Sequence, residues 1–429
     1  MSNLNLIPIG KLFDLEKGSL QSSKCTEGEY TFITAAQEWK THNEYSHECE
    51  ALIFAAAASG SLGRTHYIND KFITSDLCFI LTPKDSKKYP INLKFYHFVF
   101  NSLKDEIVKN TKSGTSKESI NQSNLRNYEI PYFEIDKQNL WIDKLVNTKL
   151  IKEDLELELS TGQSLLKQLK QTILQEAIEG KLTEKWRVKN PDIGTAKELL
   201  EQIKTEKEKL IKEKKIRPSK PLSPINEDEI PFDIPPSWEW CRLGDIANGF
   251  QYGTSTKSKI NGRVPVLRMG NIQNGRVLLE ELVYTDNESE IEKYSIEYND
   301  LLFNRTNSRE LVGKTAIYSF QEKAIYAGYL IKYSMILSNS HYINYVMNSP
   351  FHYQWCAKVR SDAIGQSNIN ATKLQSYIVP LPPLEEQKEI VATIEKLFTL
   401  CNELESEINQ NKTTVDNLMV TVLKESFEN

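Results

Sequence analysis

The sequence is poor in the residues that build disulfide frames and metal sites. It has only six cysteines and six histidines in 429 residues. The cysteines are scattered, with no CxxC pair. This spacing excludes a typical zinc site and favours isolated thiols in a reducing compartment over a disulfide frame. The histidines are equally dispersed, so we expect no metal ligands in this chain.

Long apolar runs are also missing. No stretch reaches the roughly 20 apolar residues that a membrane-spanning helix needs. The N-terminal segment, MSNLNLIPIGKLF, lacks the basic and apolar regions of a signal peptide. We therefore expect a cytoplasmic protein that makes no membrane contact. An apolar content of 39%, with 10% aromatic residues, is enough to bury two or more folded cores in a chain of this length.

Catalytic and nucleotide-binding signatures are absent. Gly313-Lys314-Thr315 resembles the end of a phosphate-binding loop, but the glycine that the pattern needs at position 308 is Ser308. The sequence has no GxSxG, HExxH or Asn-Pro-Pro-aromatic motif, and no GxGxxG after a strand. Paired carboxylates lie mostly on expected solvated helices and need no acid–base role. We predict no catalytic residue, with an enzyme of diverged site as an alternative.

What the chain does contain is an internal repeat. Residues 120–131 (INQSNLRNYEIP) align with residues 369–380 (INATKLQSYIVP), at an offset of 249 positions. Matches at the same offset continue as far as Glu179 and Glu428. An ungapped register over about 60 residues indicates two copies of one unit and an approximate two-fold in the fold.

Each copy is predicted to be a globule of short strands and helices followed by a long helix. The predicted boundaries are 1–136 for the first domain, 137–182 for a central helix, 183–236 for a linker with a short helix at 195–216, 237–381 for the second domain and 382–429 for a C-terminal helix. In the linker, Thr195 and Glu198 form a capping box, and a proline-rich extended connector follows the short helix.

Both long helices carry apolar residues at spacings of three and four, which is typical of a coiled-coil seam. The predicted seam residues are Leu145, Leu155, Leu159, Leu166, Leu169 and Ile173 in the first copy, and Ile394, Leu397, Leu404, Ile408, Val415, Leu418 and Val422 in the second. Each copy skips one layer, at Gly162 and Asn411. We expect the helices to pair antiparallel over about 55 Å at 1.5 Å per residue. Packing of each helix on its own domain is the alternative.

The predicted fold class is therefore α+β: two repeated mixed α/β domains, separated by a long antiparallel two-helix coiled coil and related by a pseudo-two-fold.

Small, polar and basic loops recur in both copies, although the net charge of −5 argues against nucleic-acid affinity of the whole chain. Arg, Asn and Gln side chains can make two hydrogen bonds to guanine or adenine edges, while Ser, Thr and Lys hold phosphates. The candidate DNA-binding residues are Gln21, Ser22, Ser23, Lys24, Arg64, Lys112, Ser113, Thr115, Lys117, Asn121, Tyr252, Thr254, Ser255, Lys257, Arg268, Arg305, Asn307, Arg309, Lys314, Lys358, Arg360, Gln366, Asn368 and Asn370. Their recurrence in both copies favours recognition over plain solvated loops.

Three segments carry a resemblance to a known family. They are residues 230–246 (IPFDIPPSWEWCRLGDI), residues 365–391, which include GQSNI and IVPLPPLEEQKEIV, and residues 169–182 (LKQTILQEAIEGKL). Together with the repeat, they resemble the specificity subunit of a type I DNA restriction–modification system. The first copy departs from the motif where its long helix begins, and only Gln138 keeps the pattern.

The resemblance implies that each domain reads half of a split double-stranded DNA target and that the coiled coil sets the gap between the halves. It implies two methyltransferase (modification) subunits, which carry S-adenosylmethionine and methylate adenine. Up to two restriction/translocase subunits, using ATP and magnesium, are also implied, whereas this chain binds no cofactor and performs no catalysis. A coiled-coil scaffold that does not touch DNA, and a specificity subunit of a related system with fused methylase and nuclease, are the alternatives.

Overall fold

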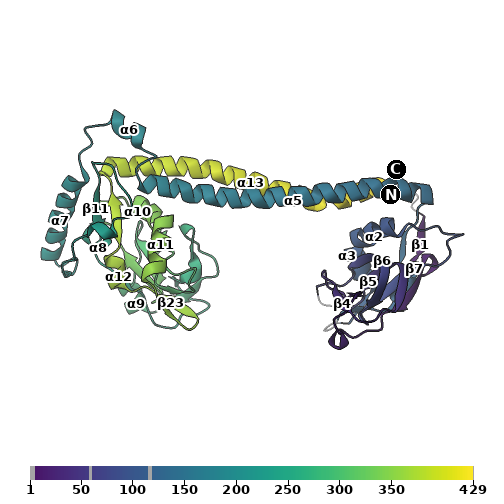
Figure 1. Ribbon diagram of the computed structural model, residues 1–429. Helices are drawn as coiled ribbons and strands as arrows, with labels where there is room; N and C mark the ends of the chain where they lie inside the picture. The colour runs from purple at the N-terminus through teal and green to yellow at the C-terminus, as the bar shows by residue number, and fades with distance from the viewer. Residues whose placement is uncertain (1–4, 58–59, 115–117, 429) are drawn as a thin grey trace. The chain divides into compact units, whose positions relative to one another are not determined.

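The computed structural model describes residues 5–57, 60–114 and 118–428, and the chain divides into two compact units. Unit 1 comprises Met1–Gly162 with Glu407–Asn429, and unit 2 comprises Gln163–Ser406. Each unit contains a globular part and a section of two long helices, α5 (Ile135–Ile178) and α13 (Leu384–Glu428) (Figure 1). Within the described residues, no helix is both long enough and apolar enough to cross a membrane.

Unit 1 is built on a six-stranded sheet. Its strands are β2 (Phe13–Lys17), β3 (Tyr30–Ile33), β4 (Lys40–His42), β5 (His47–Ala55), β6 (Thr65–Thr74) and β7 (Cys78–Pro83), in the order β2-β7-β5-β6-β3-β4. The helices are α1 (Ile9–Leu12), α2 (Leu93–Ser102), α3 (Lys104–Thr111), α4 (Gln122–Asn127) and the 3-10 turn η1 (Ser22–Lys24). Two small antiparallel pairs complete the unit: β1 (Leu6–Pro8) with β10 (Glu129–Pro131), and β8 (Lys112–Ser113) with β9 (Ser119–Ile120).

Strand β5 supplies both faces of the unit 1 core. Because successive side chains of a strand point to opposite faces, Leu52 and Phe54 enter one apolar cluster and Ile53 enters another. The first cluster also receives α2, which packs against β5 and β6 (Figure 1). A strand buried on both faces reads as a continuous apolar run, as Ala51-Leu52-Ile53-Phe54 does.

The unit 1 core also contains the end of the last helix. Trp141 and Leu145 of α5 and Val422 and Leu423 of α13 all belong to the apolar cluster that contains β5 and α2. Leu423 is only 1% exposed. Segments from both ends of the sequence therefore form one folded body.

Unit 2 contains a second six-stranded sheet. Its strands are β12 (Gln251–Tyr252), β14 (Ile272–Gln273), β15 (Gly275–Val277), β17 (Leu301–Asn304), β19 (Thr315–Ile317) and β21 (Leu330–Tyr333), in the order β12-β21-β17-β19-β15-β14. Smaller sheets are formed by β13 (Val264–Leu267), β16 (Val283–Thr285) and β20 (Ile325–Tyr326), by β18 (Thr306–Asn307), β22 (Ser361–Ala363) and β23 (Gln366–Asn368), and by β11 (Glu239–Arg242) with β24 (Ile378–Leu381). The helices are α6 (Glu184–Lys189), α7 (Ala196–Lys212), α8 (Leu243–Ile246), α9 (Glu288–Lys293), α10 (Ser340–Val346), α11 (Pro350–Val359) and α12 (Ala371–Gln375), with 3-10 turns η2 (Glu227–Glu229) and η3 (Met269–Asn271).

The repeat predicted from the sequence is present in the topology of both sheets. Adjacent strands at corresponding positions of the two six-stranded sheets have the same relative direction. For example, β2–β7 and β12–β21 are antiparallel, and β3–β6 and β15–β19 are parallel. The edge strands differ, because β4 follows β3 in the chain whereas β14 precedes β15. The two-copy α+β fold is confirmed, and its edge hairpins have diverged.

The long helices begin at equivalent residues even though their starting sequences differ. Gln138 is fully buried; its Oε1 accepts from the backbone N–H of Asn92 at 2.6 Å, and its Nε2 donates to Phe133 O at 2.6 Å. Gln387 makes the same two bonds, with Asn339 N at 2.8 Å and Pro382 O at 2.9 Å. This glutamine, the one residue of the motif that both copies retain, therefore joins the start of each long helix to the N-cap of a shorter one. Gln138 bonds Asn92, which caps α2, and Gln387 bonds Asn339, which caps α10.

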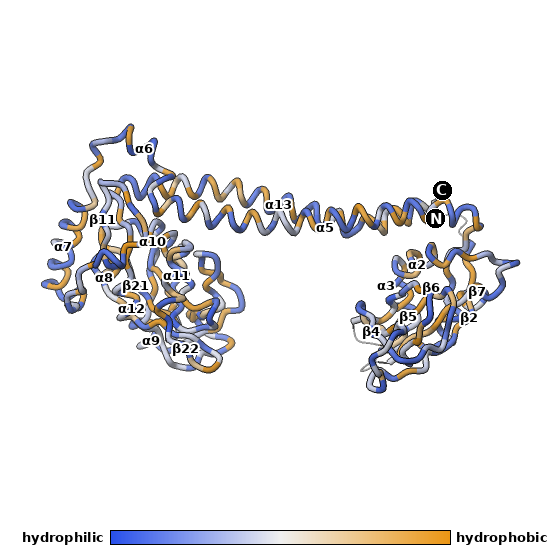
Figure 2. Tube along the Cα trace, viewed as in Figure 1, coloured by the Kyte–Doolittle hydropathy of each residue, from blue (hydrophilic) through white to orange (hydrophobic). Residues whose placement is uncertain are grey.

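Pairing of α5 with α13 is visible inside each unit. In unit 1, Lys144 contacts Glu425 at 3.2 Å and Lys152 Nζ donates to Asp416 O at 3.3 Å, so the partner numbers fall as the α5 numbers rise and the helices run antiparallel. In unit 2, Lys170 bonds Glu405 at 2.7 Å. Figure 2 shows apolar and polar residues interspersed along both helices, as expected for a narrow seam.

The seam residues differ in burial. Leu145, Leu166, Ile173, Ile394, Val415 and Val422 are buried, and Leu155, Leu159, Leu397, Ile408 and Leu418 are partly buried. Leu169 and Leu404 are 46% and 48% exposed, so the prediction of a buried apolar layer is wrong at these two positions. Lys170 is the reason: its Nζ binds Asn402 Oδ1 at 3.1 Å as well as Glu405, and these polar bonds take the place of an apolar contact at this level.

The linker is part of unit 2. The predicted capping box of Thr195 and Glu198 is present, and α7 packs its apolar face against α8. The helix ends at Lys212, earlier than the predicted 216, because Lys214 adopts a left-handed backbone with φ +57°. The proline-rich segment is held by the guanidinium of Arg242, which donates to the carbonyls of Ser223 at 3.1 Å and Pro224 at 3.0 Å.

A buried carboxylate joins the linker to the start of α13. Glu386 is fully buried and accepts from Thr183 Oγ1 at 2.7 Å, from Arg187 Nε at 2.9 Å and from Trp238 Nε1 at 2.9 Å. A buried charge is tolerated only when it is paired and its remaining lone pairs are bonded, and Glu386 meets both conditions. Its partners come from two separate segments, α6 with its N-cap residue and the residues just before β11, so one side chain of α13 fastens both.

Replacing Gly63 is expected to destabilise unit 1 by about 2–4 kcal/mol, from backbone strain plus overpacking. Gly63 has φ +79°, and an added Cβ would stand 2.6 Å from Val108 Cγ2 on α3. Gly60, at φ +78°, has no atom of the described residues within 4 Å of such a Cβ. Urea unfolding of Gly63→Ala and Gly60→Ala should therefore give a clearly larger loss for the first; equal losses would contradict the close approach of α3.

Candidate nucleic-acid interface

Unit 2 brings three of the predicted loops together around Arg305. This residue lies between β17 and β18, and its guanidinium carbon stands 4.8 Å from the centroid of the Tyr252 ring. Its Nη2 lies 3.4 Å from Asn368 Oδ1, and its Nη1 lies 3.5 Å from Gly328 O. Both bonds are long compared with the usual 2.9–3.0 Å, so the guanidinium is placed mainly by stacking on the aromatic ring.

The partners of Arg305 are themselves fixed. Strand β18 pairs with β23, which sets Thr306 opposite Asn368, and the Asn368 amide donates to Thr306 Oγ1 at 2.7 Å. The Tyr252 hydroxyl accepts from the backbone N–H of Ala371 at 2.9 Å. Tyr252, Arg305 and Asn368, named here the arginine patch, were predicted from separate loops, and Asn307 adjoins them through its pairing with Ser367.

A carboxylate that sequence reasoning missed lies against two other candidate arginines. Asp362 pairs with Arg309 Nη2 at 2.8 Å and lies 3.2 Å from Arg360 Nε, the latter contact at an angle too poor for a hydrogen bond. Ser367 Oγ donates to the same carboxylate at 2.6 Å, and this bond with the two arginines holds the pKa of Asp362 below its usual value. The only signal in the sequence was its position two residues after Arg360.

The hairpin of β22 and β23 projects polar and apolar residues at its tip. Gln366 is exposed, as predicted for a contact residue, and Ile364 at the turn is 106% exposed. The hairpin belongs to the same small sheet as β18, so it borders the arginine patch.

A hollow of about 750 Å³ lies beside the patch; one more candidate, Arg268, lines it, and another, Lys314, bonds to a residue of its lining. Arg268 lines it with Gln273 and Tyr329, and Lys314 Nζ donates to Gln273 Oε1 at 2.8 Å. Burial lowers the pKa of the Lys314 ammonium. The backbone N–H of Arg305 donates to Tyr329 O at 2.9 Å, which joins the hollow to the patch. Arg268 is held at the rim by a 2.8 Å bond to Glu281 O.

Other unit 2 candidates have different surroundings. Thr254 is buried, and its hydroxyl accepts from the N–H of Thr256 at 3.0 Å. Asn370 caps α12 by accepting from Lys373 N at 2.9 Å. Both side chains are engaged in local structure, so their predicted contact with DNA is not needed to explain them. Ser255, Lys257 and Lys358 are exposed.

The described candidates of unit 1 make separate local contacts. Arg64 donates to Ala35 O and Ser61 Oγ, both at 3.2 Å, and Lys112 pairs with Glu118 at 2.7 Å. Asn121 caps α4 as Asn370 caps α12, and Ser113 donates to Ser119 O. The remaining exposed residues are Gln21, Ser22, Ser23 and Lys24, in and next to η1. Thr115 and Lys117 lie outside the described residues.

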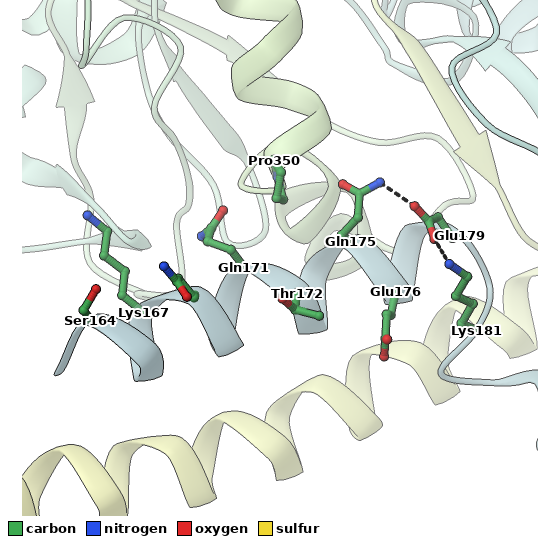
Figure 3. A pocket seen from close by; sticks show the side chains of 10 residues that line it. Ser164, Lys167, Gln171, Thr172, Gln175, Glu176, Glu179, Lys181 and Pro350 are labelled. Atoms are coloured by element: carbon green, nitrogen blue, oxygen red, sulfur yellow. Dashed lines mark hydrogen bonds and ion pairs between the residues drawn. The ribbon is translucent and has the colours of Figure 1, made fainter. Parts of the chain in front are cut away.

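A second hollow, of about 820 Å³, lies in unit 2 between the end of α5 and the start of α11 (Figure 3). It is lined mainly by amide and charged side chains, and Gln175 donates to Glu179 at 2.8 Å while Lys181 pairs with Glu179. None of the predicted site residues lines it. Across the described part of the chain, no three His, Cys, Asp or Glu side chains gather as a metal site would require.

A duplicated α+β fold with paired long helices and an arginine-centred polar patch defines a two-domain repeat protein. The sequence model of the type I restriction modification DNA specificity domain matches residues 1–159 and 235–411. The chain belongs to this family.

Relatives and solved structures agree with that membership. The chain is 33% identical over 268 residues to the type I restriction enzyme EcoAI specificity subunit of Escherichia coli, a match that covers 60% of this chain and 44% of that one. It is 26% identical to the EcoKI specificity subunit of Escherichia coli strain K12, covering 79% and 66%. The match thus spans less than half the length of the EcoAI subunit.

Among solved structures, one from work on complex assembly and conformational transition of the type I R-M system has a TM-score of 0.69 at 14% identity, covering 99% of this chain and 97% of the other. The HsdS subunit from Thermoanaerobacter tengcongensis has a TM-score of 0.52 at 15% identity, covering 99% and 96%. At these identities the likeness concerns the fold alone.

Proposed function

We propose that this chain is the DNA-specificity subunit of a type I restriction–modification complex. Unit 1 and unit 2 would each read one half of a split double-stranded target, and the paired helices would set the gap. The observation that carries the proposal is the duplicated unit, whose two sheets share one pattern of parallel and antiparallel neighbours, in a chain of the DNA specificity family.

The partners in this proposal are two methyltransferase subunits and up to two restriction/translocase subunits. S-adenosylmethionine, ATP and magnesium would be bound by those partners in the cytoplasm, and this chain would contribute the address and no catalytic group. The arginine patch supports the assignment of DNA recognition to this chain, because it offers donors suited to nucleic acid.

Mapping of methylated adenines in DNA from cells that carry the complex tests the proposal. The expected result is methylation within a motif of two short specified blocks separated by a fixed number of unspecified bases. The assembled complex should also retain that DNA in a salt-dependent manner. A continuous motif, or DNA retention that ignores sequence, would favour the scaffold alternative or another kind of DNA-binding protein.

A further inference from the structure

Arg305 differs from Arg309 and Arg360 in the partner that its positive charge has within the described residues. Arg309 and Arg360 share the carboxylate of Asp362, so each has an acidic partner within the protein. Arg305 has no carboxylate partner among the described residues; its contacts are the Tyr252 ring, an amide oxygen and a backbone carbonyl. Its positive charge is therefore left for an acceptor outside the chain.

The donors of Arg305 are also incompletely used. A guanidinium carries five N–H donors. Two of them make bonds of 3.4 and 3.5 Å, and the Nε is buried with no hydrogen-bond partner among the described residues. A ligand with two acceptors side by side would engage the two terminal nitrogens, whose present bonds are long.

The plane of the guanidinium is set before any ligand arrives. The Tyr252 ring, whose centroid is 4.8 Å from the guanidinium carbon, and the bonds to Asn368 and Gly328 restrain it, while Tyr252 is anchored by Ala371 N and Asn368 by Thr306. A fixed plane favours a contact that makes two bonds, and the O6 and N7 acceptors of a guanine edge offer such a contact. The exposed β22–β23 hairpin stands beside this plane, as a groove-entering element would.

Resting on the proposed function, we propose that Arg305 is the residue of unit 2 that determines specificity for one guanine, by donating to its O6 and N7 in the major groove. Tyr252 and Asn368 act as positioning residues. Arg309 and Arg360 shape the hairpin through Asp362 and do not choose a base.

The test uses the full chain assembled with its methyltransferase, and compares the methylation motifs of wild type, Arg305→Ala and Arg305→Lys. Both variants are expected to lose about ten- to one-hundred-fold of the preference for guanine at one position of one block. The other block should be unchanged, which also shows that the chain has folded. Arg305→Lys should keep more DNA affinity than Arg305→Ala, because it keeps the charge without the planar fork.

Arg263→Ala is the matched control. Arg263 is an exposed arginine of unit 2, paired with Glu288, and its loss removes the same charge without touching the arginine patch. Its motif should be that of wild type.

Two results overturn the inference. If Arg305→Ala weakens binding equally for all bases and Arg305→Lys restores it, the ligand is a phosphate; if the motif has no Arg305-dependent guanine, the residue does not read the base. In both cases wild type still gives a split motif, whereas a wild type without any split motif defeats the proposed function itself.

Discussion

Lengthening α5 and α13 together by one heptad is expected to widen the gap between the two recognised blocks while leaving the bases of each block unchanged. The insertion points are Gly162/Gln163 and Ser406/Glu407, where the two units meet in sequence, so contacts within each unit are kept. Seven residues add about 10 Å at 1.5 Å per residue, which corresponds to about three base pairs at 3.4 Å each. Methylation mapping of the lengthened chain measures the new gap.

The affinity of the lengthened chain should fall, since three base pairs turn the second block by roughly 100° about the DNA axis. A heptad inserted in α5 alone is the control. It leaves α5 seven residues longer than α13 between the unit 1 contacts (Lys144–Glu425 and Lys152–Asp416) and the unit 2 contact (Lys170–Glu405). Both sets of contacts cannot be kept, so this change should lower stability without defining a new gap. If the chain with both helices lengthened directed methylation only to sites with the original gap, the paired helices would not be what sets the gap.

Glu386→Ala is expected to destabilise unit 2 by about 3–5 kcal/mol, the usual cost of removing one partner from a buried ion pair. The loss leaves Arg187 without its carboxylate and the Trp238 indole N–H without an acceptor. Four of the six tryptophans, at 186, 238, 240 and 355, lie in unit 2, so urea unfolding followed by fluorescence reports on it.

The neighbouring Glu385 is the control for this change. Its pair with Lys388 spans 2.6 Å, but both side chains are more than half exposed. Exposed pairs contribute at most about 1 kcal/mol, so Glu385→Ala should unfold almost as wild type does. Proteolysis of 183–236 should also accelerate in Glu386→Ala alone, because the linker loses its anchor. Similar losses in both variants would show that the buried carboxylate is not the fastening point.

The repeat and the helix starts could be predicted because they rest on chemistry that is local in sequence. Glutamine occupies the equivalent position in both copies, at 138 and 387, because it bonds a backbone carbonyl five residues earlier and the backbone N–H of the residue that caps a nearby helix. Glu386 has no counterpart in the first copy, where the same position is Lys137, with its ammonium over the Phe133 ring at 5.3 Å. Glu386 depends on Thr183, Arg187 and Trp238. These residues belong to the linker and the segment that follows it, and the first copy has no such linker before α5.

The make-up of the arginine patch could be predicted only in part. Composition singled out Tyr252, Arg305 and Asn368 as polar loop residues, yet nothing in the sequence says that residues 53 and 63 positions apart meet. Composition also treated Arg305, Arg309 and Arg360 alike. Only the tertiary position of Asp362 separates Arg309 and Arg360, which contact this carboxylate, from Arg305, which has no carboxylate partner among the described residues.

Local capping and interhelical polar bonds account for the other differences. Asn121 and Asn370 satisfy helix N-termini, a role that an asparagine before a helical stretch often has and that competes with any outward contact. Leu169 and Leu404 satisfy the heptad spacing, but spacing alone does not say which neighbour reaches across the helix pair. Lys170 does so here, and the leucines stay half exposed.

Unit 1 is assembled from both termini, and this constrains how such a chain can change by recombination. Because Val422 and Leu423 complete a core otherwise made by the first 145 residues, an exchange that imports a foreign first half must import the matching tail as well. In a hybrid with a single crossover, the end of α13 would not match the core of unit 1 against which it packs. Two crossovers, one in each long helix, would instead exchange the whole of unit 1, including its C-terminal segment.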